Sequence, residues 1–221
     1  MKNTLKWLMK IYLVVPLTLF GQINSNGDYQ LWQWDFLKYQ ITDEWTLFTT
    51  LNARWGNQIS QLFYGYIQPQ IVYSPQKWVA IAPGYRQAAR RTPLTSSHWI
   101  PEYIPLADIT FYAKPGKWEI HNRNRVEYTI SEITDFPWLF RTRLRFYLPV
   151  HWTSLKIRPF FDNEIFWRQA AGINEDRLSA GFKMIFSDNW GSDIYYMARF
   201  HAAEPHWVYQ NVFNFTINMK Y

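Results

Sequence analysis

Charged residues recur at every second position in several segments of this sequence, and they are the residues best suited to do chemistry. Side chains two apart in an extended chain point to the same side, so each run would present a row of charges. Guanidinium groups bind carboxylates and phosphates through paired hydrogen bonds. We therefore predict a charge network with an excess of arginine, whose members are Arg123, Arg125, Glu127, Arg141, Arg143, Arg145, Arg158, Asp162, Glu164 and Arg177, with Asp108 as a further candidate.

The segment from Trp118 to Leu148 carries most of this set. In both of its arms the charged positions alternate with largely apolar ones, such as Ile120 and Val126 in the first arm and Phe140 in the second. A period of two predicts β-strands with one charged and one apolar face. Residues 131–137 would connect the arms into a hairpin, which places the arginines of one strand beside those of the other.

The composition of the chain is that of one domain in contact with lipid. Aromatic residues make up 20% of the 221 residues and include 13 tryptophans; aromatic side chains with a polar atom gather at membrane interfaces. The chain has no cysteine, which excludes disulfides and thiolate chemistry. Its net charge of +6 falls to +3 when the N-terminal segment with its three lysines is removed, and this balance gives no reason to expect a nucleic-acid partner.

The N-terminal residues have the pattern of a secretory signal peptide. Three lysines, at positions 2, 6 and 10, precede an apolar run over residues 11–20, and Gly21 offers a small residue for cleavage. The run is too short to span a bilayer, so a retained anchor is the less favoured alternative. We predict a signal peptide over residues 1–21 and a β-barrel domain over residues 22–221.

The rest of the chain reads as a succession of strands. Ten segments alternate in polarity, over residues 44–55, 61–73, 78–87, 102–113, 118–130, 138–148, 155–167, 177–186, 191–200 and 207–221. Residues 29–41 alternate more weakly, and would form either an extra strand or a segment held inside the lumen. Bacterial single-chain barrels have even strand numbers. The predicted fold is all-β, a single antiparallel transmembrane barrel of 10 to 12 strands with a charged lumen.

Connections and tryptophans support this fold. Tight turns near residues 42–43, 74–77, 114–116, 149–153 and 187–189 alternate with longer loops over 56–59, 88–101, 131–137, 168–176 and 201–206. Outer-membrane barrels have short periplasmic turns, longer outer loops and an aromatic girdle at each interface. The two predicted girdles are Trp45, Trp78, Trp118, Trp152 and Trp190 at the turns, and Trp55, Trp99, Trp138, Trp167 and Trp207 at the loops. A soluble lipocalin-like barrel, apolar inside and charged outside, is the alternative.

The charge network allows three interpretations. It could be a salt-bridge network that rigidifies the lumen, because unpaired buried charges are costly. It could be a constriction that favours anions, because arginines outnumber acids. It could also belong to an enzyme, for which His121 is the candidate base and Ser131 or Ser179 the candidate nucleophile. The sequence has no spacing that marks a hydrolase triad, so the enzyme is the least favoured of the three.

Two loops contain further candidates. His201 and His206 flank a glutamate and Pro205, which disfavours the helix that zinc proteases need. A loop site for a divalent cation is therefore a minor alternative to a solvated loop, and we expect no cofactor. Basic residues Arg90, Arg91 and His98 of the longest loop could contact anionic lipid headgroups.

Five short motifs in order resemble a known family. They are Pro101-Glu102-Tyr103, Arg123-Asn124-Arg125-Val126-Glu127, Arg141-Thr142-Arg143-Leu144-Arg145, Asp162-Asn163-Glu164-Ile165-Phe166 and Asp176-Arg177-Leu178-Ser179-Ala180-Gly181. Together they resemble the bacterial domain-of-unknown-function family 2490, small exported proteins interpreted as outer-membrane barrels; Tyr103 and Glu175 depart mildly from its pattern. The resemblance implies the fold and no activity. The last strand, with Phe213, Phe215 and Tyr221, resembles the signal read by the outer-membrane assembly machinery.

These features predict a protein of the bacterial outer membrane without a catalytic role. We expect either a narrow, porin-like pore or a structural envelope component, in both cases with an arginine-rich, salt-bridged lumen. A lipid-modifying or hydrolytic barrel enzyme and a soluble periplasmic lipid carrier are the alternatives. The expected partners are outer-membrane lipids and, through the strand that ends at Tyr221, the assembly machinery.

Overall fold

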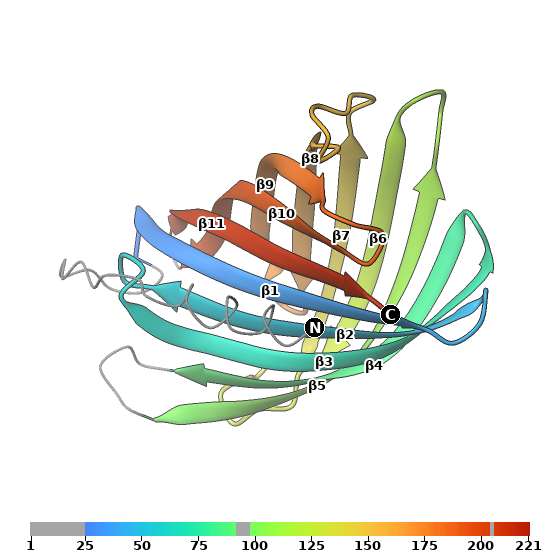
Figure 1. Ribbon diagram of the computed structural model, residues 1–221. Helices are drawn as coiled ribbons and strands as arrows, with labels where there is room; N and C mark the ends of the chain where they lie inside the picture. Colours follow the sequence, from blue (N-terminus) through green and yellow to red (C-terminus); the bar gives the residue numbers. More distant parts are fainter. Residues whose placement is uncertain (1–24, 92–97, 204–205) are drawn as a thin grey trace, which may run out of the picture.

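A closed β-barrel makes up the protein. The computed structural model describes residues 25–91, 98–203 and 206–221, so the predicted signal peptide lies outside the described residues. Eleven strands are found in the described part of the chain, and they form one closed sheet (Figure 1). The strands are β1 Asp28–Gln40, β2 Trp45–Gly56, β3 Gln61–Gln76, β4 Val79–Arg91, β5 Trp99–Ala113, β6 Glu119–Tyr128, β7 Trp138–Tyr147, β8 Arg158–Arg168, β9 Gly172–Ile185, β10 Trp190–Ala203 and β11 His206–Lys220.

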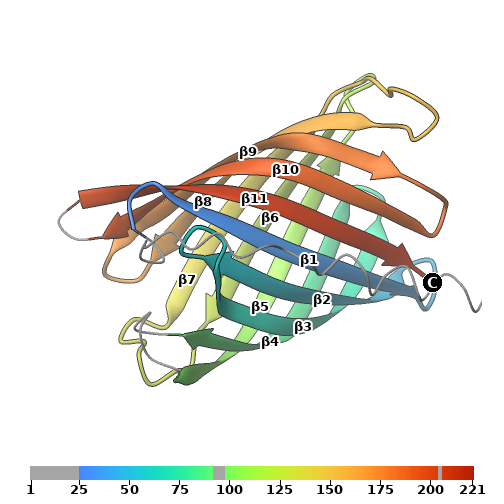
Figure 2. The same ribbon diagram turned by 60° about the vertical axis from the view of Figure 1, so that its left-hand side comes forward.

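The barrel closes through a parallel pair. Each strand from β1 to β11 pairs with its neighbour in sequence in antiparallel fashion. With an odd number of such strands the first and the last run the same way, and β1 pairs parallel with β11, from Asp28 beside Gln210 to Lys38 beside Lys220. Figure 2 shows β1 in the wall between β2 and β11. The predicted all-β barrel of 10 to 12 strands is confirmed, with this parallel seam in place of an entirely antiparallel wall.

The seam also decides between the two interpretations of residues 29–41. They form a wall strand, β1, rather than a segment held in the lumen. Because β1 and β11 are parallel, the start of β1 and the final residue Tyr221 lie at opposite ends of the barrel. We call the end with Tyr221 and the connections β1–β2, β3–β4, β5–β6, β7–β8 and β9–β10 the turn end. We call the opposite end, where β1 begins, the loop end.

Several predicted loops at the loop end are shorter than expected. Strand β4 continues to Arg91 and β5 begins at Trp99, so much of the predicted loop 88–101 is strand, and the two residues are register partners. The predicted loops 168–176 and 201–206 shrink in the same way, because β9 begins at Gly172 and β10 extends to Ala203. The reason is that a ladder of backbone hydrogen bonds continues past the point where side-chain alternation becomes weak.

The predicted contrast between tight turns and longer loops fails at one connection. Strand β8 begins at Arg158 rather than near residue 155, so residues 148–157 separate β7 from β8 at the turn end. Within this connection Trp152 and Ile157 form an isolated antiparallel bridge. The predicted tight turn at 149–153 is therefore part of a longer, partly paired connection, and loop length alone does not distinguish the two ends.

The two faces of the wall differ as the alternation predicts. Outward side chains such as Ile71 and Ile194 are each 49% exposed, whereas the inward Arg125 and Glu127 are 6% and 3% exposed. This is the reverse of a lipocalin-like barrel, which buries apolar side chains and exposes charges. No helix in the described residues is long and apolar enough to cross a membrane.

The tryptophans divide between the outer surface and the lumen. Nine of the ten predicted girdle residues are exposed, and Trp55 is half-buried. Trp32 of β1, by contrast, is 1% exposed and packs inside the barrel with Met197 and Val212. The exposed rings therefore lie near both ends of the outer wall.

Glycine at one lumen position permits close packing of the wall. A Cβ atom at Gly84 of β4 would lie 2.6 Å from the carbonyl oxygen of Pro69 on β3. The absent side chain leaves room for Gln70, whose Nε2 donates to Asp108 Oδ2 at 2.7 Å. The predicted kink at Pro83-Gly84 thus helps to place a polar side chain in the lumen.

Candidate functional site in the lumen

A belt of paired charges crosses the lumen and is the candidate functional site. Its residues occupy inward positions of strands β4 to β10, since side chains two apart share a face. The register brings the runs together: Arg125 stands opposite Arg141, and Glu164 opposite Arg177. We define the charge belt as Arg86, Asp108, Arg123, Arg125, Glu127, Arg141, Glu164, Glu175, Arg177 and Arg199.

Glu127 is the acceptor for three arginines. Arg86 of β4 donates from Nη2 to Oε1 at 2.8 Å and from Nη1 to Oε2 at 3.2 Å. Arg141 Nη2 lies 2.8 Å and Arg125 Nη1 3.4 Å from Oε1 of the same carboxylate. Like charges directly opposite on neighbouring strands repel. Glu127 offsets the repulsion between Arg125 and Arg141 because it accepts from both.

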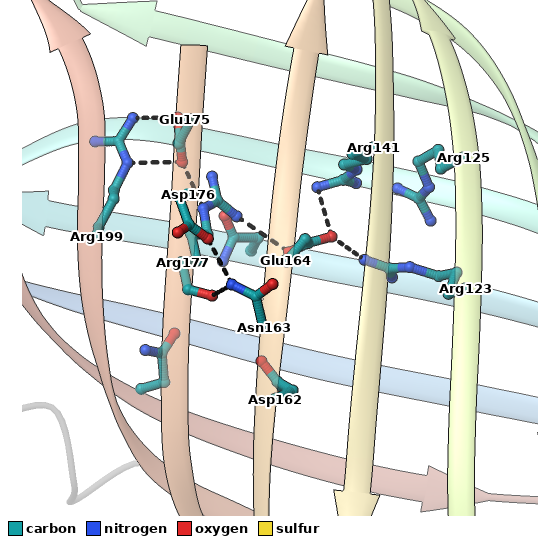
Figure 3. Close-up of polar contacts among 12 residues, drawn as sticks. Arg123, Arg125, Arg141, Asp162, Asn163, Glu164, Glu175, Asp176, Arg177 and Arg199 are labelled. Atoms are coloured by element: carbon teal, nitrogen blue, oxygen red, sulfur yellow. Dashed lines mark hydrogen bonds and ion pairs between the residues drawn. The ribbon is translucent and has the colours of Figure 1, made fainter. Parts of the chain in front are cut away.

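Glu164 and Glu175 continue the belt. Figure 3 shows Glu164 between Arg123 and Arg141 on one side and Arg177 on the other; the closest contact is 2.6 Å, to Arg123 Nη2. Arg141 Nη1 and Arg177 Nη1 each lie 3.6 Å from this carboxylate. Glu175 then accepts from Arg177 and from Arg199, the latter at 2.8 Å to each oxygen. The result is a chain of alternating sign, Arg86–Glu127–Arg141–Glu164–Arg177–Glu175–Arg199.

Two further ion pairs lie on the turn-end side of this chain of alternating charges. Asp108 accepts from Nε and Nη2 of Arg125, the second at 2.6 Å. Arg145 donates from Nε to Asp162 Oδ2 at 2.6 Å. Buried charges are tolerated when they are paired and their remaining hydrogen-bonding capacity is used, and Asp108 meets this condition by accepting from Gln70 as well.

The predicted site residues do not all join the belt. Of the ten, the structure brings Arg123, Arg125, Glu127, Arg141, Glu164 and Arg177 together in it, and pairs Arg145 with Asp162 beside it. Arg158 lies apart, near the turn end, where Nη1 is 2.6 Å from Glu119 Oε2. Arg143 lines the lumen but makes no ion pair among the described residues.

Three belt residues are not among the network members predicted from the sequence. Arg86, Glu175 and Arg199 lie on β4, β9 and β10. Arg86 shares the inward face of β4 with Ala82, Ala88 and Arg90, and Arg199 shares that of β10 with Met197 and Asp193. A sparse charge on a strand face with small or apolar neighbours is therefore the signal that points to such members, because a buried charge needs a partner.

The belt separates two cavities in the lumen. The cavity towards the loop end has a volume of about 500 Å³, and Arg54, Arg90 and Arg168 contribute to its lining. The cavity towards the turn end has a volume of about 460 Å³. Arg141 and Arg177 line both cavities, which places the belt between them.

The candidate catalytic residues do not form a nucleophile–base pair. His121 Nε2 lies 2.7 Å from Glu119 Oε1, and its ring packs edge-on against Tyr112 and Tyr147. Within the described chain neither Ser131 nor Ser179 hydrogen-bonds to His121. A nucleophilic serine needs a base within hydrogen-bond reach, so the lumen geometry gives the hydrolase interpretation no support.

The loop candidates occupy less organised surroundings. Residues 204 and 205 of the predicted cation loop lie outside the described residues, and the residues that are described contain no group of three metal-ligating side chains. Arg90 Nε pairs with Glu102 Oε1 at 2.6 Å, at the rim of the lumen. His98 lies 3.8 Å from Glu132 with both side chains exposed. Contact of these basic residues with lipid headgroups stays a prediction.

The chain belongs to the DUF2490 family, described as proteins of unknown function, because the family model matches residues 29–210. The match begins in β1 and ends in β11, so it covers nearly the whole barrel and every residue of the charge belt. The resemblance carried by the five motifs is thereby confirmed. No curated protein sequence matches the chain.

Proposed function

We propose that the protein is a bacterial outer-membrane barrel that serves as a structural component of the envelope, with its lumen closed by the charge belt. The observation that carries this proposal is the continuous chain of alternating charges across the lumen, from Arg86 to Arg199. The proposal has two parts, an outer wall in lipid and a lumen without an open pathway.

The outer wall supports insertion in lipid. Its mid-height side chains are apolar, as Ile67 and Leu178 show with exposures of 47% and 50%. The shortest strands have 10 residues and the longest has 16, and about 9–11 tilted residues cross a bilayer. Exposed tryptophans near both ends match the girdles of outer-membrane barrels. Contiguous apolar surface on this scale is rare on soluble monomers.

The belt supports a closed lumen. Its central carboxylates are each shared by two or three guanidinium groups, and Glu127 and Glu164 are only 3% and 6% exposed. Conduction requires ion sites that bind weakly enough to release the ion. A passing ion would have to displace a guanidinium from a buried carboxylate, which is strongly unfavourable. The belt therefore favours the structural role over the narrow pore.

Two measurements test the two parts separately. For the wall, we expect tryptophan fluorescence of the refolded protein to be quenched by lipids brominated on their acyl chains, and unquenched fluorescence would contradict insertion. For the lumen, we expect no steady conductance after incorporation into planar bilayers at moderate salt. A stable open level for the unaltered protein, with selectivity that changes in Arg141→Gln, would refute closure by the belt.

A further inference from the structure

The cavity between the belt and the turn end has two unlike walls. Strands β1 to β4 form one side and β6 to β10 the other. In the closed order of eleven strands, β2 and β7 are separated by five steps in one direction and six in the other, so they face each other across the lumen. Phe48 of β2 and Arg143 of β7 both line this cavity.

The first wall carries an aromatic patch beside Lys38 and polar side chains such as Thr46 and Gln70. Phe36 and Phe48 stack with ring centroids 5.7 Å apart, and Val72 and Ala82 continue the lining on β3 and β4. Both phenylalanines point into the lumen and are nevertheless half-buried rather than buried. Trp34 extends the stack, 6.1 Å from Phe36. This wall offers aromatic surface that other side chains cover only in part.

The second wall carries cations without ion pairs. Arg143 stands opposite Arg123 and Glu164 in the register, but Glu164 is already occupied by three other arginines. Lys183 of β9 has its Nζ over the Tyr147 ring at 5.5 Å, and among the described residues it likewise makes no ion pair. The remaining carboxylates at this cavity are engaged by arginines, except that Asp193, the register partner of Lys183, keeps one unpartnered oxygen and lies 3.8 Å from Arg145.

We propose that this cavity binds a small amphipathic carboxylate, with its carboxylate on Arg143 and Lys183 and its apolar part against Phe36 and Phe48. A guanidinium with free donors is suited to a carboxylate, and a volume of about 460 Å³ lies within the range of small-molecule sites. A purely hydrophilic anion would leave the aromatic wall unused. A neutral apolar molecule would leave the cations without a partner.

This site goes beyond the proposed structural role and does not depend on it. The belt forms the floor of the cavity, so the ligand would enter from the turn end whether or not the barrel also conducts. The site is distinct from the belt because its anchoring cations are the ones that the belt does not use.

Equilibrium dialysis of radiolabelled octanoate against the protein in lipid nanodiscs tests the proposal, with empty nanodiscs as the blank for octanoate in lipid. We expect saturable binding to the unaltered protein and about tenfold or more weaker binding to Arg143→Gln, since a hydrogen bond to a charged group is worth about 1.5–3 kcal/mol. Lys183→Gln should also weaken binding, Arg143→Lys should retain most of it, and Phe48→Ser should weaken octanoate more than acetate. Arg168→Gln, in the other cavity, is the matched control.

Several outcomes would overturn the site. Octanoate that binds Arg143→Gln and Lys183→Gln as tightly as the unaltered protein would show that these cations do not hold the carboxylate. Octanol that competes as well as octanoate would show that the cations do not contribute to binding. Inorganic phosphate that competes as well would show that the aromatic wall does not contribute. Because Arg143 makes no ion pair, its variants should fold, and the heat-modified mobility of the barrel on gels verifies this in each sample.

Discussion

Replacement of Glu127 by glutamine should destabilise the barrel by leaving a buried arginine without a counter-ion. The carboxylate accepts from Arg86, Arg141 and Arg125. Two of these retain another carboxylate, Asp108 for Arg125 and Glu164 for Arg141. Among the described residues Arg86 has no second carboxylate, and its remaining hydrogen bond to a side chain is the one to Gln68. The change therefore leaves one buried cation without a counter-ion.

The expected loss of stability follows from the one buried cation that is left without a counter-ion. Removal of one partner from a buried ion pair costs about 3–5 kcal/mol, because the other charge remains buried and uncompensated. Glutamine keeps one carbonyl oxygen as an acceptor, which places Glu127→Gln near the lower limit, about 3 kcal/mol. Arg86→Met in the same chain removes the orphaned cation, so the double variant should be more stable than the sum of the single effects predicts, by at least about 1 kcal/mol.

Urea unfolding in lipid vesicles, followed by tryptophan fluorescence and by gel mobility, measures these differences. Glu132→Gln is the control, because the Glu132 side chain is 64% exposed and pairs with His98 at 3.8 Å. Exposed pairs of this kind contribute about 0–1 kcal/mol. A loss below about 1 kcal/mol in Glu127→Gln, or additive effects in the double variant, would show that Glu127 does not compensate the charge of Arg86.

Three further substitutions probe the wall, the unpaired cation and the close approach of strands by the same unfolding assay. Ile67→Arg on the outer face should cost about 2–4 kcal/mol in vesicles, and a neutral effect would contradict its contact with lipid. Arg143→Gln should change stability by less than about 1 kcal/mol, because no ion pair is lost; a large loss would place Arg143 in the network. Gly84→Val should cost about 1–3 kcal/mol or more, since its Cβ would lie 2.6 Å from the Pro69 carbonyl oxygen, and wild-type stability would refute the tight approach.

The two faces of the wall could be predicted because strand periodicity is local. The face on which a residue such as Arg125 lies can be predicted from its neighbours two positions away. Arg125, Glu127 and Arg141 do line the lumen. The parallel seam could not be predicted in this way. It pairs Asp28 with Gln210, and nothing in the alternation of either segment specifies a partner so distant in sequence.

The extent of pairing was predictable only in part for a related reason. Arg90 and Ile100 are register partners although Arg90 belongs to a run of basic residues that reads as a loop. Strand pairing there depends on backbone groups, which every residue carries, rather than on side-chain pattern. Likewise Arg86 pairs with Glu127, 41 positions away, so its role follows from barrel closure and not from its own segment.

Within the described part of the chain, the arginines of the lumen fall into two groups, those in ion pairs and those without an ion pair. In the belt Glu127, Glu164 and Glu175 are each shared by two or three guanidinium groups, and these cations hold the wall together. The cations left over face the cavities instead: Arg143 and Lys183 face the turn end, while Arg54 faces the loop end, stacked on Trp32 at 3.9 Å. Stacking on an aromatic face partly compensates a cation without neutralising it. The lumen therefore combines a centre of paired charges, suited to stability, with cations on both sides of it that make no ion pair among the described residues and are suited to anions.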